Sequence, residues 1–403
     1  MKKVWDKWTR IALVKRILVG LILGAILGIA VPQATGIAIL GDVFVSALKA
    51  IAPLLVFFLV VSSLCNAGKS HGGVIKTVII LYMFSTVLAA VIAVFASMAF
   101  PVKMTLANAA TDTSAPQGIV EVLNNLLLNV VANPVSSLVN ANYVGILMWA
   151  VLLGLAFRAA DKMTKKVLAD VADGISMVVT WIINLAPFGI FGLVFNTVST
   201  NGLDIFTTYG KLLLLLVGCM LFIYFVTNPL LVYWCIRQNP YPLIFHCLKR
   251  SALTAFFTRS SAANIPVNMK VCEEMGLDRD TYSVTIPLGA TINMDGAAIT
   301  ITVMTMATAF TLGIHVDIPT AIILSLLAAL SACGASGVAG GSLLLIPMAC
   351  SLFGISDDIS MQVVAVGFII GVVQDSVETA LNSSSDLLLS ASAEFRQWRL
   401  EGE

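Results

Sequence analysis

Apolar segments long enough to cross a membrane follow one another along almost the whole chain. A helix needs about 20 mostly apolar residues to span the hydrocarbon core of a bilayer. Only 11% of the 403 residues are charged, whereas a soluble protein has about 25%. The chain is therefore predicted to be an all-α polytopic membrane protein. The apolar segments lie near 11–31, 43–65, 75–99, 118–157, 173–199, 211–236, 241–268, 281–311, 320–354 and 360–393.

Two of these segments do not fit a single unbroken helix. The segment 118–157 is too long for one span, so we expect it to be broken. The segment 281–311 has a suitable length, but its middle holds residues that disfavour a continuous apolar helix. Those residues are Pro287, Gly289 and the run Asn293, Met294, Asp295 and Gly296.

Two further segments are interrupted by small and polar residues. The segment 241–268 contains TRSSAAN at 258–264, and the segment 320–354 contains SACGASGVAGGS. Non-helical backbone at membrane depth is stable only where protein or a water-filled cavity satisfies its amides and carbonyls. A pair of such interruptions indicates a transporter binding site. The alternative is a pair of kinked core helices in which glycine and serine only permit close packing.

Basic residues cluster in alternate connections between the segments. The connections without a cluster carry little more than Lys103 and Lys211. By the positive-inside rule the N-terminus is cytoplasmic, and the last span ends inside only if both interrupted segments enter and leave on one face. We therefore expect eight transmembrane helices and two re-entrant hairpins, the first from the cytoplasm and the second from outside, with both termini cytoplasmic. The clustered residues are Lys2, Lys3, Lys7, Arg10, Lys15, Arg16, Lys69, Lys76, Arg158, Lys162, Lys165, Lys166, Arg237, Lys249, Arg250, Arg396 and Arg399.

A stripe of polar side chains runs through the last apolar segment. At about 100° per residue its members fall in one narrow sector of a helix, over roughly 16 Å at about 1.5 Å per residue. Polar groups at membrane depth face protein or a water-filled cavity rather than lipid. The stripe therefore predicts a binding site. Its members are Asp375, Glu378, Thr379, Asn382 and Asp386.

The charges expected at membrane depth do not balance. Asp295, Asp375, Glu378 and Asp386 are acidic, and Arg259 is the only nearby cation. Each intramembrane charge costs roughly 3 kcal/mol on insertion scales. A zwitterionic substrate leaves this excess of negative charge unchanged, so Na⁺ or protons must fill the site. The charge count predicts that ion binding and substrate binding are coupled, and such coupling is reciprocal.

Other features of the chain point to no further chemistry. The seven cysteines and three histidines show no metal-ligand spacing, so we expect no cofactor, and Na⁺ only as a coupling ion. A net charge of +1 argues against a nucleic-acid partner. An intramembrane aspartyl protease would use two aspartates, which Asp295 and Asp386 could supply, but it leaves both interruptions unexplained. A passive channel would instead need polar rings along a continuous pore.

Three motifs together resemble one known family. TRSSAANIPVN lies in the first interrupted segment, TIPLGATINMDGAA in the broken span and DSVETALNSSSD in the last span. These motifs are similar to those of the dicarboxylate/amino acid:cation symporters, the glutamate-transporter family. The order of spans and both hairpins agree over essentially the whole chain. The inverted-repeat architecture is already established for this family, so it follows here from the resemblance.

Within that family the chain is most similar to the bacterial sodium/serine–threonine symporters. The resemblance implies sodium-coupled uptake of small neutral hydroxy amino acids, L-serine and L-threonine, by an elevator mechanism. It also implies a homotrimer in contact with lipid in the cell inner membrane. Coupling to sodium or protons with other neutral amino acids or dicarboxylates is the alternative. Ion stoichiometry, the preference among serine, threonine and alanine, and the conformational state stay open.

The resemblance implies roles for particular residues in substrate binding. Asp375 is expected to bind the substrate ammonium, while Asn382, Thr379 and backbone amides at both hairpin tips are expected to cradle its carboxylate. The substrate-binding residues implied are Arg259, Ser260, Ser261, Val338, Ser342, Asp375, Glu378, Thr379 and Asn382.

The resemblance also implies sodium ligands, and hard cations such as Na⁺ prefer oxygen. Tyr82, Ser85 and Thr86 match the oxygens around a deep site, and carbonyls of Thr291 and of the second hairpin frame another. The implied ligands are Tyr82, Ser85, Thr86, Gly289, Thr291, Asn293, Asp295, Ala332, Cys333, Ala335, Asn382 and Asp386.

The chain departs from acidic-amino-acid transporters at one informative position. Those relatives hold the side-chain carboxylate of their substrate with an arginine that matches Glu378 here, and a helpful threonine of theirs matches Ala297. A glutamate at this position repels a second carboxylate, so glutamate and aspartate should be rejected. Glu378 either accepts a hydrogen bond from a substrate hydroxyl or pairs with Arg259. The sequence leaves both roles open.

The resemblance further implies two structural units. Residues 1–72 and 101–205 are expected to form a scaffold and trimerisation domain. Residues 73–100 and 206–403 are expected to form a transport domain that holds the hairpins 241–268 and 320–354. Gly334, Gly337, Gly340 and Gly341 give the second hairpin the hinge freedom of an extracellular gate.

Overall fold

The chain folds into long helices, and the described residues contain no strand. The computed structural model describes residues 11, 13–66, 73–106, 128, 130–202, 205–333, 335 and 340–402. The helices of the first half are α2 Leu13–Ala30, α3 Ala38–Asn66, α4 Gly73–Ala99, α6 Pro134–Val139, α7 Tyr143–Ala156, α8 Lys162–Asn184 and α9 Ala186–Asn201. The second half has α10 Ile205–Phe222, α11 Asn228–Ile236, α12 Tyr241–Cys247, α13 Leu253–Thr258, α14 Ser261–Glu274, α15 Arg279–Ile292, α16 Asp295–Thr311, α17 Ile318–Ala332, α18 Ile346–Ser351 and α19 Asp357–Glu401.

Short 3₁₀ and π segments join several of these helices. The 3₁₀ segments are η1 Thr35–Ile37, η2 Phe157–Ala159 and η5 Gly341–Leu345, and the π segments are η3 Ile223–Thr227 and η4 Leu248–Ala252. Within the described residues, six helical stretches are long and apolar enough to cross a membrane. The prediction of an all-helical protein with several long apolar helices is therefore confirmed for the described residues.

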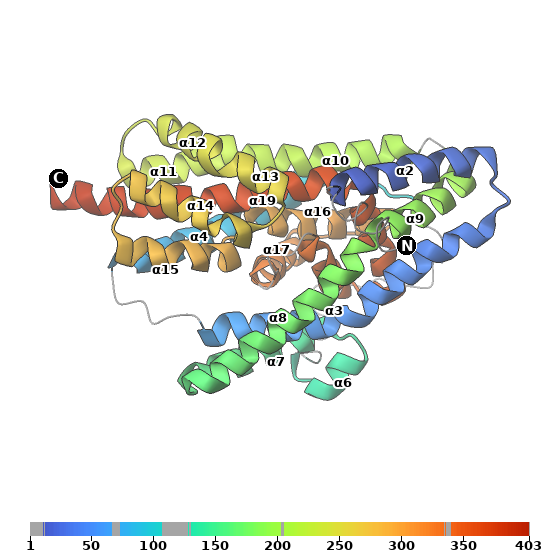
Figure 1. Ribbon diagram of the computed structural model, residues 1–403, viewed down its shortest axis with the longest axis horizontal. Helices are drawn as coiled ribbons and strands as arrows, with labels where there is room; N and C mark the ends of the chain where they lie inside the picture. Colours follow the sequence, from blue (N-terminus) through green and yellow to red (C-terminus); the bar gives the residue numbers. More distant parts are fainter. Residues whose placement is uncertain are drawn as a thin grey trace.

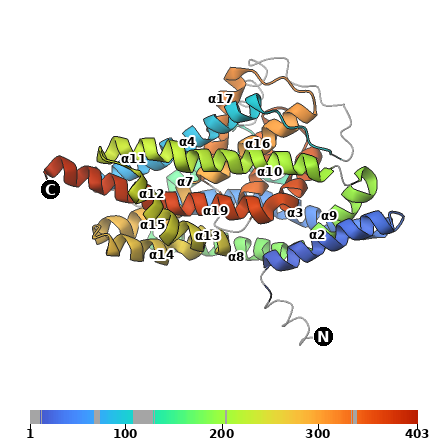
Figure 2. The same ribbon diagram turned by 90° about the horizontal axis from the view of Figure 1, so that it is seen from above.

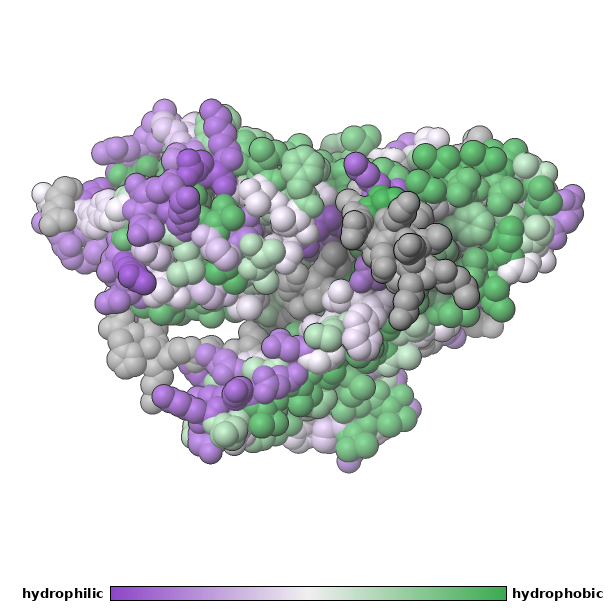
Figure 3. Space-filling view, in the orientation of Figure 1, coloured by the Kyte–Doolittle hydropathy of each residue, from purple (hydrophilic) through white to green (hydrophobic). Residues whose placement is uncertain are grey.

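The last helix, α19, lies at the centre of the second half of the chain. It packs against α10 and α11 on one side and against α13, α14 and α15 on the other (Figure 2). Its C-terminal end extends to one end of the long axis (Figure 1). The helices α2, α3, α7, α8 and α9 pack mainly on one another, away from most of α19. Hydrophilic side chains gather at the end that holds α12, α14 and α15, whereas apolar side chains cover the opposite end, formed by α2, α3 and α9 (Figure 3).

The first half packs through small residues on facing helices. A Cβ added at Gly20 would lie 2.2 Å from the carbonyl oxygen of Pro187, and one at Gly24 would lie 2.6 Å from that of Phe191. These glycines sit one turn apart on α2 and let its backbone touch α9. Membrane helices associate by such close packing because lipid is as apolar as their side chains.

The predicted span 173–199 is wrong as a single helix. The structure divides this region into α8 and α9 at Leu185. Pro187 lies in the first turn of α9, where its missing N–H costs nothing, but the same residue cannot continue α8 because its ring clashes with the preceding turn. Of the predicted segment 118–157, the described part contains α6 and α7, separated by Asn140 to Asn142.

The predicted break in 281–311 is narrower than expected. The chain leaves the helical conformation at Asn293 and Met294, between α15 and α16. Pro287 and Gly289, by contrast, lie inside α15. Pro287 follows eight residues of α15, so the helix accommodates it and the interruption is limited to two residues.

Both interrupted segments contain non-helical backbone between helices. In the first, α13 ends at Arg259, which has a left-handed φ of 52°, and Ser260 is extended before α14 begins. The second arm of this segment continues to Glu274, beyond the predicted boundary at 268. In the second segment, α17 ends at Ala332 and helix resumes at Gly341. Gly334, Gly337 and Val338 lie outside the described residues.

Candidate binding site at the hairpin tips

The predicted polar stripe lies on one continuous helix. Ser356 caps the N-terminus of α19, Asp357 and Asp358 complement its dipole, and Gly402 ends it with a left-handed φ of 86°. The stripe faces the protein interior, and its members are between 1% and 6% exposed. Asp375, Glu378, Thr379, Asn382 and Asp386 are thus removed from the surface along the helix axis.

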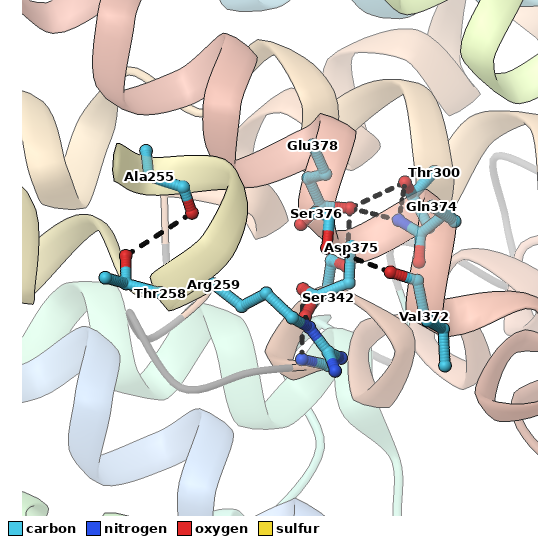
Figure 4. A network of polar contacts seen from close by, with 11 residues as sticks. Ala255, Thr258, Arg259, Thr300, Ser342, Val372, Gln374, Asp375, Ser376 and Glu378 are labelled. Carbon is cyan, nitrogen blue, oxygen red and sulfur yellow. Dashed lines mark hydrogen bonds and ion pairs between the residues drawn. The ribbon is translucent and has the colours of Figure 1, made fainter. Parts of the chain in front are cut away.

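Asp375 is bound from both interrupted segments. Arg259 Nε donates to Asp375 Oδ2 at 2.6 Å, reaching across from the end of α13 (Figure 4). The backbone N–H of Gly340 donates to Asp375 Oδ1 at 3.2 Å. The side chains of Arg259 and Asp375 are only 10% and 5% exposed. One carboxylate on α19 therefore contacts both interrupted segments, the first through Arg259 and the second through Gly340.

Glu378 lies one turn further along α19 and has different partners. Its Oε2 accepts hydrogen bonds from Thr300 Oγ1 at 2.7 Å, Ser342 Oγ at 2.9 Å and Gln374 Nε2 at 2.5 Å. The alternative in which Glu378 pairs with Arg259 is wrong, because Arg259 pairs with Asp375 instead (Figure 4). The geometric reason is helical: Asp375 and Glu378 are about 60° apart on α19, and Arg259 reaches only the former.

The N-terminus of α16 packs directly on the stripe. The backbone N–H of Gly296 donates to Asn382 Oδ1 at 2.7 Å. A Cβ at Gly296 would lie 2.9 Å from Cγ of Glu378, so only glycine allows this approach. Ala297 is fully buried in the same turn. The positive end of the α16 dipole is consequently directed at the carboxylates.

Asp295 belongs to a second group of oxygens, between α4 and α16. Ser85 Oγ donates to Asp295 Oδ2 at 2.7 Å, and Thr86 Oγ1 donates to Asp295 Oδ1 at 3.2 Å. Asn228, at the start of α11, approaches Ser85 Oγ at 3.5 Å. Ser85, Thr86, Asn228 and Asp295 are all fully buried. This group contains three oxygen-bearing side chains near one carboxylate.

Asn293 and Asp386 form a third group beside the break in the spanning helix. Asn293 Nδ2 donates to Asp386 Oδ1 at 2.9 Å and to Ser385 Oγ at 2.9 Å. Asn293 Oδ1 is buried and has no hydrogen-bond partner among the described residues. A buried carbonyl oxygen without a donor is costly, and a bound cation would satisfy it.

Tyr82 lies next to this group rather than beside Asp295. Its Oη is 2.8 Å from the carbonyl oxygen of Asp386 and 2.8 Å from Ser390 Oγ. Gly289 is required here, because a Cβ would lie 2.7 Å from Asp386 Oδ1. The structure thus separates Tyr82 from Ser85 and Thr86, which the sequence had grouped around one site.

The second interrupted segment meets the end of α15. Cys333 Sγ lies 3.5 Å from the carbonyl oxygen of Ile292. The carbonyl of Ala332 accepts the N–H of Ala335 at 2.8 Å, and Thr291 Oγ1 bonds within its own helix to Leu288. Cys333 therefore brings the second segment to the end of α15, while the Ala332 carbonyl and the Thr291 hydroxyl make local hydrogen bonds.

The remaining predicted residues lie at the first tip and on α19. Ser260 accepts the N–H of Ala263 at 3.2 Å and caps α14, and Ser261 is buried in its first turn. Thr379 is 6% exposed and makes no hydrogen bond with the described residues. Ser260 therefore satisfies one N–H at the start of α14, whereas the hydroxyl of Thr379 has no partner among the described residues.

Several residues of the site were not predicted from the sequence. Gln374 and Ser390 lie one helical turn from stripe members, so the i, i+4 spacing alone would have found them. Thr300 and Asn228 approach the site from other helices, and no local pattern marks them. Asn264 and Asn268 are buried against Ser383 at 2.8 and 3.2 Å and fix α14 to α19.

Comparison with known proteins identifies close relatives over the full length. The model of the sodium:dicarboxylate symporter family matches residues 13–394. The chain is 58% identical to the serine/threonine transporter SstT of Bifidobacterium adolescentis, over 100% of this chain and 94% of that protein. It is 55% identical to the serine/threonine transporter SstT of Streptococcus thermophilus, over 99% of this chain and 100% of that protein.

Proposed function

The chain belongs to the sodium:dicarboxylate symporter family, and we propose that it is a sodium-coupled secondary transporter of L-serine and L-threonine. The relatives that are more than half identical over their full length carry the name serine/threonine transporter. The observation that carries the proposal is the gathering of four buried carboxylates along α19 and at the start of α16. Asp295, Asp375, Glu378 and Asp386 are each at most 5% exposed, and among the described residues Arg259 alone pairs with one of them as a cation.

The substrate ammonium binds Asp375 in this proposal. Arg259 now holds that carboxylate, so the incoming ammonium displaces the guanidinium and leaves it near the first tip. Charge is conserved by this exchange, because one cation replaces another at the same carboxylate. The pairing of Arg259 with Asp375 supports the proposal that the charge of Asp375 is neutralised when no substrate is bound.

The substrate carboxylate binds where α14 begins. The N-terminus of a helix presents unpaired N–H groups and the positive end of its dipole. Ser261 lies in the first turn of α14, and Thr379 lies one turn beyond Asp375 on α19 with no hydrogen bond to the described residues. Both groups favour an anion, which supports a zwitterionic amino acid with its two charges a few ångströms apart.

Glu378 sets selectivity for a hydroxyl group. Three donors already fix its Oε2, so the carboxylate is rigid and leaves its other oxygen to accept one more hydrogen bond. A side-chain hydroxyl supplies that donor, whereas a side-chain carboxylate is repelled. This favours serine and threonine over the dicarboxylates for which the family is named.

Sodium binds at the two oxygen groups on either side of the helix break. Asp386 and the unpartnered Asn293 Oδ1 suit one ion, and Asp295 with Ser85 and Thr86 suits another. Carboxylate, amide and hydroxyl oxygens are the ligands that hard cations prefer. A third ion is proposed between the end of α15 and residues 332–335. Filling these sites offsets the negative charge that the zwitterion leaves behind.

Transport proceeds by movement of one unit against another in this proposal. The scaffold, residues 1–72 and 101–205, and the transport unit, residues 73–100 and 206–403, share few contacts compared with those inside each unit. Such an arrangement supports a sliding, elevator-like motion. We further propose a homotrimer in the cell inner membrane with both termini in the cytoplasm, which agrees with the gathering of hydrophilic side chains at the end that holds α12, α14 and α15.

Uptake into proteoliposomes tests the proposal. A sodium gradient directed inward should drive concentrative uptake of labelled serine, and unlabelled threonine should compete while aspartate does not. Replacing the sodium gradient with a proton gradient should abolish uptake. Downhill flux of serine that is indifferent to every ion gradient would instead identify a channel, and competition by aspartate equal to that by threonine would contradict the assigned selectivity.

A further inference from the structure

A long apolar groove lies on the outside of the molecule, between α4 and α10. These two helices lie side by side (Figure 2). The groove has a volume of about 840 Å³, which is within the range of about 300–1,000 Å³ typical of ligand sites. Its walls include Ile92, Phe95 and Phe100 from one side and Leu214 and Phe222 from the other. The groove is remote from the carboxylates of the proposed transport site and shares no residue with it.

The length of the groove matches one leaflet of a bilayer. Its lining on α10 extends from Lys211 to Phe222, a distance of about 16 Å at 1.5 Å per residue. Half of the hydrocarbon core of a bilayer is about 15 Å thick. An acyl chain that lies along this groove would therefore reach from the headgroup level to about the middle of the membrane.

The two lysines at one end of the groove are unusual in their position. Lys211 lines the groove, and Lys103 follows directly on the lining residues Phe100, Pro101 and Val102. In the proposed orientation these are the only Lys or Arg residues of the outer connections, where the positive-inside rule disfavours them. Lys211, on α10, lines the groove, and Lys103 is the residue after its lining segment. This placement of both exceptions indicates a shared partner with negative charge.

The segment that carries Lys103 is held in place. The backbone N–H of Met104 donates to Thr311 Oγ1 at 2.8 Å. Val102 and Met104 are 9% and 4% exposed, whereas Lys103 between them is exposed. This alternation is that of an extended strand-like segment whose lysine points outward. Lys211 makes no hydrogen bond or ion pair with any residue in the described part of the chain, so its charge is available to a ligand.

We propose that this groove binds an anionic phospholipid of the outer leaflet. One acyl chain lies between α4 and α10, and the phosphate pairs with Lys211 and Lys103. Only the choice of leaflet depends on the orientation given under the proposed function; the binding itself does not depend on transport. An anionic lipid is favoured over a zwitterionic one because the rim offers two cations, and the described groove lining contains no acidic residue.

The chain offers a matched pair of variants on one helix. A Cβ at Gly218 meets nothing within 4 Å, and the same is true of Gly210, eight residues earlier on α10. Gly218 lines the groove, whereas Gly210 does not. Gly218→Phe should therefore fill the groove without straining the backbone, and Gly210→Phe adds the same side chain elsewhere. Lys211→Gln removes a rim charge, and Lys211→Arg keeps it.

Native mass spectrometry of the purified, full-length protein tests the proposal. Detergent-solubilised samples are titrated with phosphatidylglycerol or with phosphatidylethanolamine of the same acyl chains. We expect phosphatidylglycerol to bind more tightly, and we expect Lys211→Gln to weaken it about fivefold, as one charge near a membrane surface implies. Lys211→Arg and Gly210→Phe should bind like the parent protein, and Gly218→Phe should lose both lipids.

Two results would overturn the proposal. Equal binding of both lipids, unchanged by Lys211→Gln, would mean that the surface is ordinary lipid-facing helix. Binding by Gly218→Phe that equals binding by Gly210→Phe would mean that lipid attaches elsewhere. Thermal unfolding of each variant verifies that it is folded. Since no step measures uptake, failure of this proposal is distinguishable from failure of the proposed transport function.

Discussion

The interface between α2 and α9 and the interface around α19 are built on opposite principles. In the first, Gly20, Gly24 and Gly28 bring the backbones of two helices into close contact. In the second, buried Asp, Glu, Asn, Ser and Thr side chains from five helices meet along one stripe. Both interfaces hold helices together in a membrane, where the hydrophobic effect does not drive helices to associate.

The two interfaces differ in whether they need bound ions. A glycine-packed interface needs no ligand, because van der Waals contact between the two helices stabilises it. A cluster of buried carboxylates is complete only when cations balance it. We therefore expect ions to stabilise the α19 region and to leave the α2–α9 interface indifferent.

The largest effect is expected for Asp386→Asn. This change keeps the shape of the side chain but removes a charge that is 1% exposed, so the ion beside Asn293 loses its carboxylate ligand. Sodium-driven serine uptake should fall by about 100-fold, the upper end of effects on metal affinity from changes near a site. Asp170→Asn, on the exposed face of α8, is the matched control. Uptake by Asp386→Asn within twofold of that control would exclude Asp386 from the ion site.

Arg259→Gln is expected to slow net serine uptake more than serine–serine exchange. Without its guanidinium, the empty site holds an unpaired Asp375 at membrane depth, which costs roughly 3 kcal/mol. Net uptake requires the empty protein to cross back, whereas serine–serine exchange does not. Net uptake should therefore fall at least about tenfold more than exchange. If exchange and net uptake fall equally, Arg259 serves the loaded protein rather than the empty one.

A change in selectivity is expected for Glu378→Gln. A hydrogen bond to a charged group contributes about 1.5–3 kcal/mol, so serine affinity should fall about tenfold. Alanine lacks the hydroxyl, and its affinity should change by less than about twofold. Competition assays with both amino acids measure the ratio. An unchanged ratio of serine to alanine affinity would remove the hydroxyl contact from Glu378.

The smallest effect is expected for Gly24→Leu in the glycine-packed interface. Overpacking of this kind costs about 1–3 kcal/mol, and the melting temperature should fall by a few degrees whether or not sodium is present. Gly174→Leu is the control, because a Cβ at Gly174 meets nothing within 4 Å. A loss of stability that disappears in sodium would contradict the division between the two interfaces.

Local patterns predicted much of the fold. The stripe on α19 and the break at Asn293 are local features, because helical periodicity and polar residues within an apolar run are visible in a single segment. The boundary between α8 and α9 is also local, because Pro187 marks it. A hydropathy window over 173–199 does not detect this single residue. Pro287 does not interrupt α15, although a proline within a helical segment favours a break.

The partners of each carboxylate depend on contacts that sequence does not encode locally. Thr300 and Glu378 are 78 residues apart, and Arg259 and Asp375 are 116 residues apart. Whether Arg259 met Asp375 or Glu378 depended on how α13 approaches α19, and no pattern within either segment decides this. Asn228 joins Ser85 across 143 residues for the same reason. The polar residues in the sequence predict that a site exists, whereas the packing of the helices determines which side chains pair within it.

The dependence of serine affinity on sodium concentration shows whether sodium neutralises the buried carboxylates. Calorimetric titration of the purified protein with serine, at several sodium concentrations and at constant ionic strength with choline, gives the dissociation constant at each. If sodium neutralises the buried carboxylates, the affinity should rise steeply with sodium, and by linkage serine should raise sodium affinity by the same factor. Equal serine affinity in sodium, choline and across pH would contradict the account.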